Sequence, residues 1–138
     1  MSAKRRDVRE SGFILTFEKL FRDDTIDEII EVAEEYGDIL VDDEVVALVK
    51  GICDKADELD AVISRFSNKR AVERIPKINL AILRLAIYEA LYDDKVPVNV
   101  AISEAVALAE KYAQEPDIAF INGVLGSYSR SDEAPKNE

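Results

Sequence analysis

The sequence predicts an all-α protein. Apolar residues recur at three- and four-residue spacings along most of the 138 residues, and no segment shows the alternation typical of a half-buried strand. Residues 76–93 would be apolar on nearly every side of a helix, as expected for a buried helix, and their charges are too frequent for a membrane span. Asp, Gly and Pro separate several shorter helical segments on either side. We therefore expect six or seven helices packed around this central one.

The first two helices are indicated by an amphipathic pattern and by capping residues. Residues 4–21 place aromatic and aliphatic side chains on one helical face, with arginines in the first turns. Thr25 and Glu28 have the spacing of a capping box, in which each side chain bonds the backbone amide of the other. Gly37 is well placed to end the second helix in a left-handed conformation.

An apolar stripe then covers residues 45–66, and Asp42 or Asp43 can cap its start. This segment is long for a helix of a globular protein. We expect a bend or break near residues 54–58, which would give two helices end to end.

Prolines mark the later helices. Pro76 suits the first turn of the central helix, and Pro97 opens another that extends to about Tyr112. Residues 115–117, Glu-Pro-Asp, are expected to break the chain before a last helix at about 117–129. The polar tail, residues 131–138, is expected to be disordered.

Composition argues against an enzyme. The chain has no histidine and a single cysteine, Cys53, in an apolar helical context, so we expect no internal disulfide, no metal site and no cofactor. Neither a Gly-rich phosphate loop nor a nucleophile motif is present. Three charges in apolar helices, Arg84, Glu89 and Glu104, are expected to reach water or to form an ion pair between the central helix and the next.

Charge is distributed unevenly along the chain. The net charge of −11 argues against non-specific nucleic-acid binding by the whole surface. The first ten residues are nevertheless basic, whereas residues 23–58 are strongly acidic. This distribution fits an oriented binding surface, and it also fits an ordinary solvated helix start. No apolar run resembling a signal peptide follows the basic start, so we expect a cytoplasmic location.

Three strings in the second half of the chain are more specific. They are ILRLAIYE at residues 82–89, VPVNVAISEAVALA at residues 96–109 and FINGVL at residues 120–125. In order and spacing they resemble consecutive signatures of the NusB antitermination family, whose arginine-rich opening also resembles RRDVRE at residues 5–10. The resemblance covers nearly the whole chain, strongly at residues 75–125 and weakly at residues 23–66.

The resemblance implies a single NusB-like domain at residues 1–130, made of two small helical groups at about 1–70 and 71–130. It implies a bacterial transcription factor that acts with NusE, a small-subunit ribosomal protein. Together they would bind single-stranded boxA RNA of nascent ribosomal-operon transcripts, within the antitermination complex of RNA polymerase.

The resemblance also implies site residues. RNA contacts fall on Lys4, Arg5, Arg6, Arg9 and Phe120, and the positive end of the first helix would assist the basic residues.

Partner contacts fall on Phe17, Glu73, Asn79 and Phe120. Phe17 replaces a family tyrosine and Asn79 a family acid, so a hydrogen bond and a salt bridge at these positions are not carried over. By its pattern alone, Phe120 also fits the core.

A second interpretation is a helical protein-interaction module that acts through its acidic face, residues 23–58, without specific RNA binding. The sequence leaves open whether the protein is a monomer or a homodimer.

Overall fold

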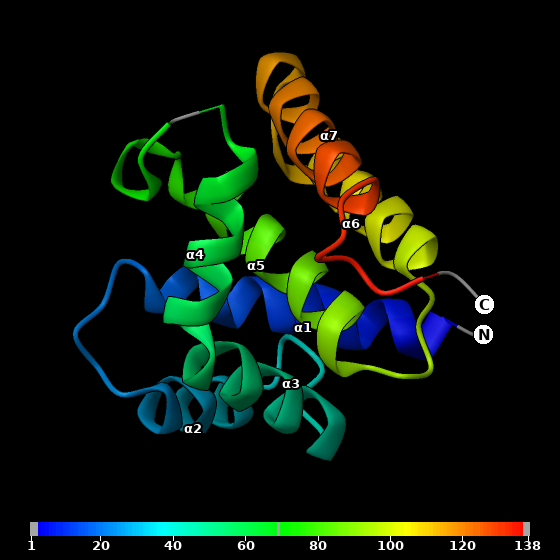
Figure 1. Cartoon of the computed structure of the whole chain (residues 1–138). Helices are drawn as coiled ribbons and strands as arrows, with labels where there is room; N and C mark the ends of the chain where they lie inside the picture. Colours follow the sequence, from blue (N-terminus) through cyan, green and yellow to red (C-terminus); the bar gives the residue numbers. More distant parts are fainter. Residues whose placement is uncertain (1–2, 69, 137–138) are drawn as a thin grey trace. The chain divides into compact units, whose positions relative to one another are not determined.

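The computed structural model describes residues 3–68 and 70–136, and within them the fold is all-helical (Figure 1). These residues form seven α-helices and one 3-10 helix, which confirms the predicted fold class. The elements are α1 (Ala3–Lys19), α2 (Ile26–Tyr36), α3 (Asp43–Asp54), α4 (Ala56–Phe66), η1 (Val72–Arg74), α5 (Lys77–Tyr92), α6 (Val98–Tyr112) and α7 (Glu115–Ser129). None of the described helices is both long and apolar enough to cross a bilayer.

The helices form two compact units. Unit 1 is Met1–Lys55 and holds α1 to α3, and unit 2 is Ala56–Glu138 and holds the remaining elements. The boundary lies before α4, earlier than the position near residue 70 that was expected between the two helical groups. It lies there because α4 packs against α5, α7 and η1, all of which are in unit 2.

Unit 1 is built on the packing of α1 against α2 and α3. Its core consists of buried aliphatic side chains, namely Val8, Leu15, Ile29, Ile30, Val45 and Val49. Gly12 lets α1 and α3 approach closely, since a Cβ atom at this position would lie 2.6 Å from Leu48 Cδ2. A larger residue at position 12 would therefore require the Leu48 side chain to move.

The helix caps that the sequence predicts in unit 1 are present in the structure. The Thr25 hydroxyl accepts from the Glu28 amide and the Glu28 carboxylate accepts from the Thr25 amide, which confirms the capping box. Gly37 ends α2 in a left-handed conformation at φ 71°. Asp42 caps α3, where its carboxylate accepts from the Val45 amide at 3.0 Å.

The long apolar stripe is broken at Lys55, between α3 and α4, inside the predicted interval. Lys55 leaves the helical conformation, with φ −101° and ψ 11°, while its amide still donates to the Gly51 carbonyl. Cys53 is half-buried just before this break, rather than fully buried as a core residue.

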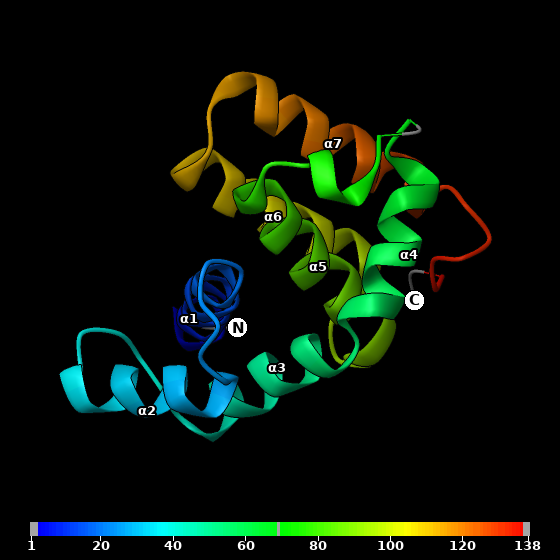
Figure 2. The same ribbon diagram turned by 90° about the vertical axis from the view of Figure 1, so that its left-hand side faces the viewer.

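Unit 2 is centred on α5, which packs against α4, α6 and α7. Ten of its sixteen residues are buried, which confirms that residues 76–93 contain a core helix. Figure 2 shows α6 and α7 running beside each other, and together with α5 they form the larger part of the unit.

Two parts of unit 2 differ from the sequence prediction. The 3-10 helix Val72–Arg74 was not predicted, and α7 begins at Glu115, so the expected break at residues 115–117 is the first turn of this helix. Pro116 is accommodated there because the first turn of a helix needs no amide donor from it.

Part of the polar tail makes contacts with the rest of unit 2. Residues 131–136 continue beyond α7, and the Glu133 carboxylate accepts two hydrogen bonds from the Arg65 guanidinium, at 2.7 and 2.6 Å. The expected disorder at residues 137–138 lies outside the described residues.

Candidate functional site

The basic residues carried over to RNA binding lie in the first turns of α1. Lys4 and Arg6 are exposed, Arg5 is half-buried, and Arg9 is only 6% exposed. Arg9 therefore does not present its guanidinium on the open surface, as a phosphate contact would require. The exposed part of this segment combines the cations of Lys4 and Arg6 with the positive end of the α1 helix dipole.

Lys4 forms ion pairs inside unit 1. Its ammonium lies 3.5 Å from a carboxylate oxygen of Asp42 and 3.5 Å from one of Glu44. Hydrogen bonding to Glu44 and the charge of Asp42 raise the pKa of Lys4, and the Val45 amide is the main cause that lowers the pKa of Asp42. An RNA phosphate that bound Lys4 would have to compete with these two carboxylates.

Phe17 belongs to a row of three phenyl rings, two on α1 and the third, Phe21, in the turn that follows it. It stacks on Phe13, with centroids 5.6 Å apart, and meets Phe21 edge to face at 5.0 Å. Phe13 is buried, Phe17 is half-buried and Phe21 is 62% exposed. The row thus leads from the interior to the surface. Phe21 was not predicted as a site residue, although its four-residue spacing from Phe17 was visible in the sequence.

In unit 2, Phe120 projects from α7 and is half-buried. The Arg70 guanidinium lies over its ring, with Cζ 4.5 Å from the ring centroid. Such a cation–π contact is worth about 0.5–1 kcal/mol at an exposed site. Arg70 is exposed and was not among the predicted site residues, because no local pattern shows that it meets a residue of the last helix.

Glu73 and Asn79, both carried over as partner contacts, lie in different environments. Glu73 is exposed on η1, where a partner can reach it. Asn79 is 0% exposed, so its expected place on a partner surface is corrected to the interior. Its side-chain amide donates to the Asp117 carboxylate at 3.0 Å and so links α5 to the first turn of α7.

The Asn79 side chain is incompletely bonded. Its Oδ1 atom is buried and has no hydrogen-bond partner among the residues that the structure describes. Because Asp117 is itself only half-buried, Asn79 can influence the surface of unit 2 by holding this carboxylate in place.

The predicted site residues are divided between the two units. Unit 1 holds the four basic residues and Phe17, and unit 2 holds Glu73, Asn79 and Phe120. Within unit 2, the structure brings together Phe120 with Arg70 and Asn79 with Asp117.

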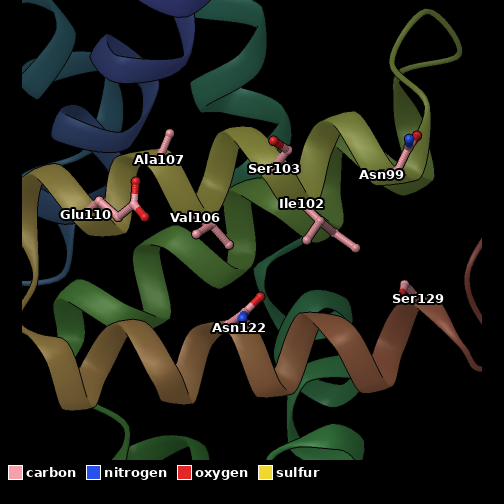
Figure 3. A pocket seen from close by; sticks show the side chains of 8 residues that line it. All are labelled: Asn99, Ile102, Ser103, Val106, Ala107, Glu110, Asn122 and Ser129. Carbon is pink, nitrogen blue, oxygen red and sulfur yellow. The ribbon is translucent and has the colours of Figure 1, made fainter.

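A groove of about 570 Å³ runs between α6 and α7 in unit 2 (Figure 3). Its lining is mostly small and polar, and consists of Asn99, Ile102, Ser103, Val106, Ala107, Glu110, Asn122 and Ser129. None of these lining residues is basic, so the groove does not offer the cations that an RNA phosphate needs. Across the described residues, no group of three or more His, Cys, Asp or Glu is arranged to hold a metal ion.

Comparison with known proteins decides the family. A sequence model of the NusB family matches residues 15–130. The chain belongs to the NusB family. The matched residues include the last part of α1, from residue 15, and all of α2 to α7, so the assignment covers both units. It agrees with the prediction that the chain is not an enzyme, since relatives are named as transcription antitermination proteins.

Two relatives illustrate the similarity within the NusB family. The transcription antitermination protein NusB of Acetivibrio thermocellus is 40% identical over 124 residues, covering 88% of this chain and 86% of the relative. The protein of the same name from Ruminiclostridium cellulolyticum is 35% identical over 130 residues, covering 93% of this chain and 90% of the relative. The similarity therefore extends over almost the full length of both relatives.

Solved NusB structures share the fold. T. maritima NusB superposes with a TM-score of 0.82 at 29% identity, covering 98% of this chain and 96% of that one. A crystal structure of antitermination factors NusB and NusE in complex with dsRNA contains a chain with a TM-score of 0.78 at 25% identity. The match covers 92% of this chain and 96% of that one.

Proposed function

We propose that this NusB-family protein is a transcription antitermination factor of the bacterial cytoplasm. In this proposal it binds single-stranded boxA RNA of nascent ribosomal-operon transcripts together with NusE, within the antitermination complex of RNA polymerase. The observation that carries the proposal is the family match over residues 15–130. The solved NusB–NusE complex with dsRNA supports the choice of RNA and NusE as partners, since its chain covers 92% of this one.

The start of α1 is the proposed phosphate-binding element. Arg6 is exposed there and Arg5 is half-buried, on a helix whose first turn contains no acidic residue among those described. Backbone amides and the helix dipole add to this positive end. Lys4 contributes when a phosphate displaces its carboxylate partners Asp42 and Glu44, and Arg9 contributes mainly by supporting the segment from within.

Such a small basic segment on an acidic protein should bind RNA weakly when alone. Neutralising about three phosphates of a single strand gives a slope of about −2 in log K against log salt, or about a 20-fold loss between 50 and 200 mM salt. The net charge of −11 adds a general repulsion of RNA. We therefore expect NusE to complete the RNA-binding surface.

The proposed NusE contacts use exposed or half-buried side chains of both units. Phe17 on α1 and its neighbour Phe21 just after it offer aromatic surface, and Glu73 offers a carboxylate on η1. Phe120 is proposed to contact both NusE and an RNA base, because unpaired bases stack on aromatic rings. Asn79 acts indirectly, through Asp117.

A double variant tests the RNA site. Changing Arg5 and Arg6 together to Ala should weaken binding of boxA RNA about tenfold, because two phosphate contacts are lost. The matched control, Lys95→Ala with Lys136→Ala, removes two exposed cations from elsewhere and should have little effect. Circular dichroism must show the same helicity for all variants. Equal RNA affinity in the two double variants would place the site elsewhere.

A second candidate function is a protein-interaction module acting through the acidic residues 23–58. One observation favours it, since Tyr36 is 79% exposed and Val32 45% exposed on α2, whose charged residues are all acidic. Filter binding with boxA RNA and with a scrambled RNA separates the two functions. Preference for boxA supports the antitermination factor, and equal weak binding of both RNAs supports the interaction module.

A further inference from the structure

Unit 2 contains a second basic segment, which runs from the last turn of α4 to the first residue of α5. Residues 64–77 include five basic residues and one acidic residue, in a chain whose net charge is −11. The basic residues are Arg65, Lys69, Arg70, Arg74 and Lys77. Such a local reversal of charge in an acidic protein is the electrostatic pattern expected of an anion-binding surface.

The backbone around Arg70 is held by a tight turn. The Arg70 amide donates to the Ser67 carbonyl at 3.0 Å, and the Ser67 hydroxyl donates to the Arg70 carbonyl at 2.8 Å. Ser67 is only 1% exposed, and Asn68 takes the left-handed conformation at φ 55°. The Arg70 side chain therefore starts from a fixed point, which reduces the entropy lost when it binds a ligand.

The side chains of Arg65 and Arg70 are used differently. Arg65 directs two guanidinium nitrogens to the Glu133 carboxylate, so its charge is balanced within the protein. Arg70 instead lies over the Phe120 ring, which is uncharged, and this contact leaves its positive charge available to a ligand. Arg74 adds a further exposed cation at the end of η1.

A guanidinium on an aromatic ring has two properties that suit single-stranded RNA. Unpaired bases stack on aromatic rings and on the planes of arginine side chains, and the same guanidinium can donate to a phosphate. We propose that Arg70 and Phe120 form one composite platform in unit 2, on which a base stacks while Arg70, helped by Arg74, binds the adjoining phosphates. The inference rests on the proposed function for Phe120 and extends the RNA contact to Arg70 and Arg74.

A purely structural role for Arg70 predicts different behaviour. If the guanidinium only shielded the Phe120 ring from water, its loss would change stability or the packing of α7, and RNA binding would keep its salt dependence. A direct phosphate contact, by contrast, changes the slope of log K against log salt by about 0.7 for a single strand.

The test measures binding of a short fluorescent boxA RNA to the full chain with NusE present, over a range of salt concentrations. Arg70→Ala should weaken binding about tenfold and flatten the salt slope by about 0.7, because a stack and a phosphate contact are lost. Arg70→Lys should keep the slope but not the affinity, because an ammonium has no plane for stacking. Lys95→Ala, which removes an exposed cation outside the segment, should match the wild type.

A spectroscopic probe adds a second readout. The chain contains no tryptophan, so Phe120→Trp introduces a single indole at the platform. RNA should quench its fluorescence, and adding Arg70→Ala should reduce that quenching at equal RNA occupancy.

The outcomes separate this inference from the proposed function. If the wild-type chain with NusE shows no preference for boxA RNA, the proposed function fails. If the wild type binds boxA and the Arg5/Arg6 variant is weakened while Arg70→Ala behaves like Lys95→Ala, the function stands and the platform is refuted. Loss of affinity with a flatter salt slope in Arg70→Ala supports the platform.

Discussion

Arg84 of α5 and Asp60 of α4 form a two-pronged ion pair, in which the Arg84 Nε and Nη2 atoms each donate to a carboxylate oxygen at 2.7 Å. The two side chains are 16% and 23% exposed. The sequence left open whether Arg84 reaches water or forms an ion pair with the next helix, and the structure pairs it with a residue of the preceding helix. This pair joins two helices of unit 2 at a defined distance and angle.

Arg84→Met should lower the free energy of unfolding by about 2–3 kcal/mol, because Asp60 is left largely buried without its partner. Adding Asp60→Leu should recover most of this loss, since no unpaired charge remains. Urea unfolding measures both effects. Arg65→Met, which breaks a more exposed pair of the same geometry, is the matched control and should cost clearly less. Equal losses in the two single variants would show that burial of the pair is not what matters.

Tyr128 should make stability depend on pH in the alkaline range. Burial, with a smaller contribution from Glu133, raises the pKa of its hydroxyl from 10.0 to about 12. The folded state therefore favours the neutral phenol, so its contribution is complete below pH about 10 and is lost as the pH rises toward 12. The loss amounts to about 2–3 kcal/mol at most. Unfolding by urea at several pH values measures it.

Tyr128→Phe should remove this alkaline loss without harming stability near neutral pH. The Tyr128 hydroxyl has no hydrogen-bond partner among residues 3–68 and 70–136, so its removal leaves no described group unsatisfied. Tyr36→Phe removes the same group from a side chain that is 79% exposed, so its stability should depend on pH as that of the wild type does. If Tyr128→Phe still lost as much stability at alkaline pH as the wild type, another group would be responsible for the loss.

Thr25→Ala should destabilise the protein by about 1 kcal/mol, because the Glu28 amide loses its acceptor and Glu28 loses half of the capping box. Thr25→Ser keeps a hydroxyl, so its stability should be close to that of the wild type. Thermal unfolding followed by circular dichroism compares the two variants. A similar loss in both would point to the threonine methyl group rather than to the cap.

Asn79→Asp should destabilise the protein by about 3 kcal/mol at neutral pH, because it places a buried carboxylate against Asp117 in place of an amide donor. The destabilisation should shrink as the pH falls, since a protonated carboxyl group can again donate to its neighbour. Urea unfolding at pH 7 and at acid pH measures the difference. A loss that is independent of pH would mean that the two side chains separate in the variant.

Features that depend on a few neighbouring residues were predictable from the sequence. The capping box at Thr25, the left-handed Gly37 and the Asp42 cap each involve groups within four residues, so their geometry follows from the helix itself. The break near Lys55 followed from the length of the apolar stripe.

Features that join distant segments were not predictable. Nothing in the sequence pairs Arg70 with Phe120, or shows that Asn79 turns inward to meet Asp117. Gly123 illustrates the same limit, because a small residue in a helical motif suggests close packing, yet a Cβ atom there would meet nothing within 4 Å. The close approach occurs at Gly12 instead.

The same division holds for the candidate site, where exposure near a helix end was predictable and burial by distant segments was not. The exposed Lys4 and Arg6 at the start of α1 and the exposed Glu73 agree with surface roles, and these stay predictions until binding is measured. Burial of Arg9 and Asn79 depends on tertiary packing, which a motif alone does not contain.

The affinity of the chain for boxA RNA, measured by fluorescence anisotropy with and without NusE, tests the central claim most directly. A composite surface predicts weak binding by the chain alone and a gain of about tenfold or more when NusE is added, with no such gain for a scrambled RNA. Equal affinity for boxA RNA with and without NusE, or an equal gain for the scrambled RNA, would contradict it.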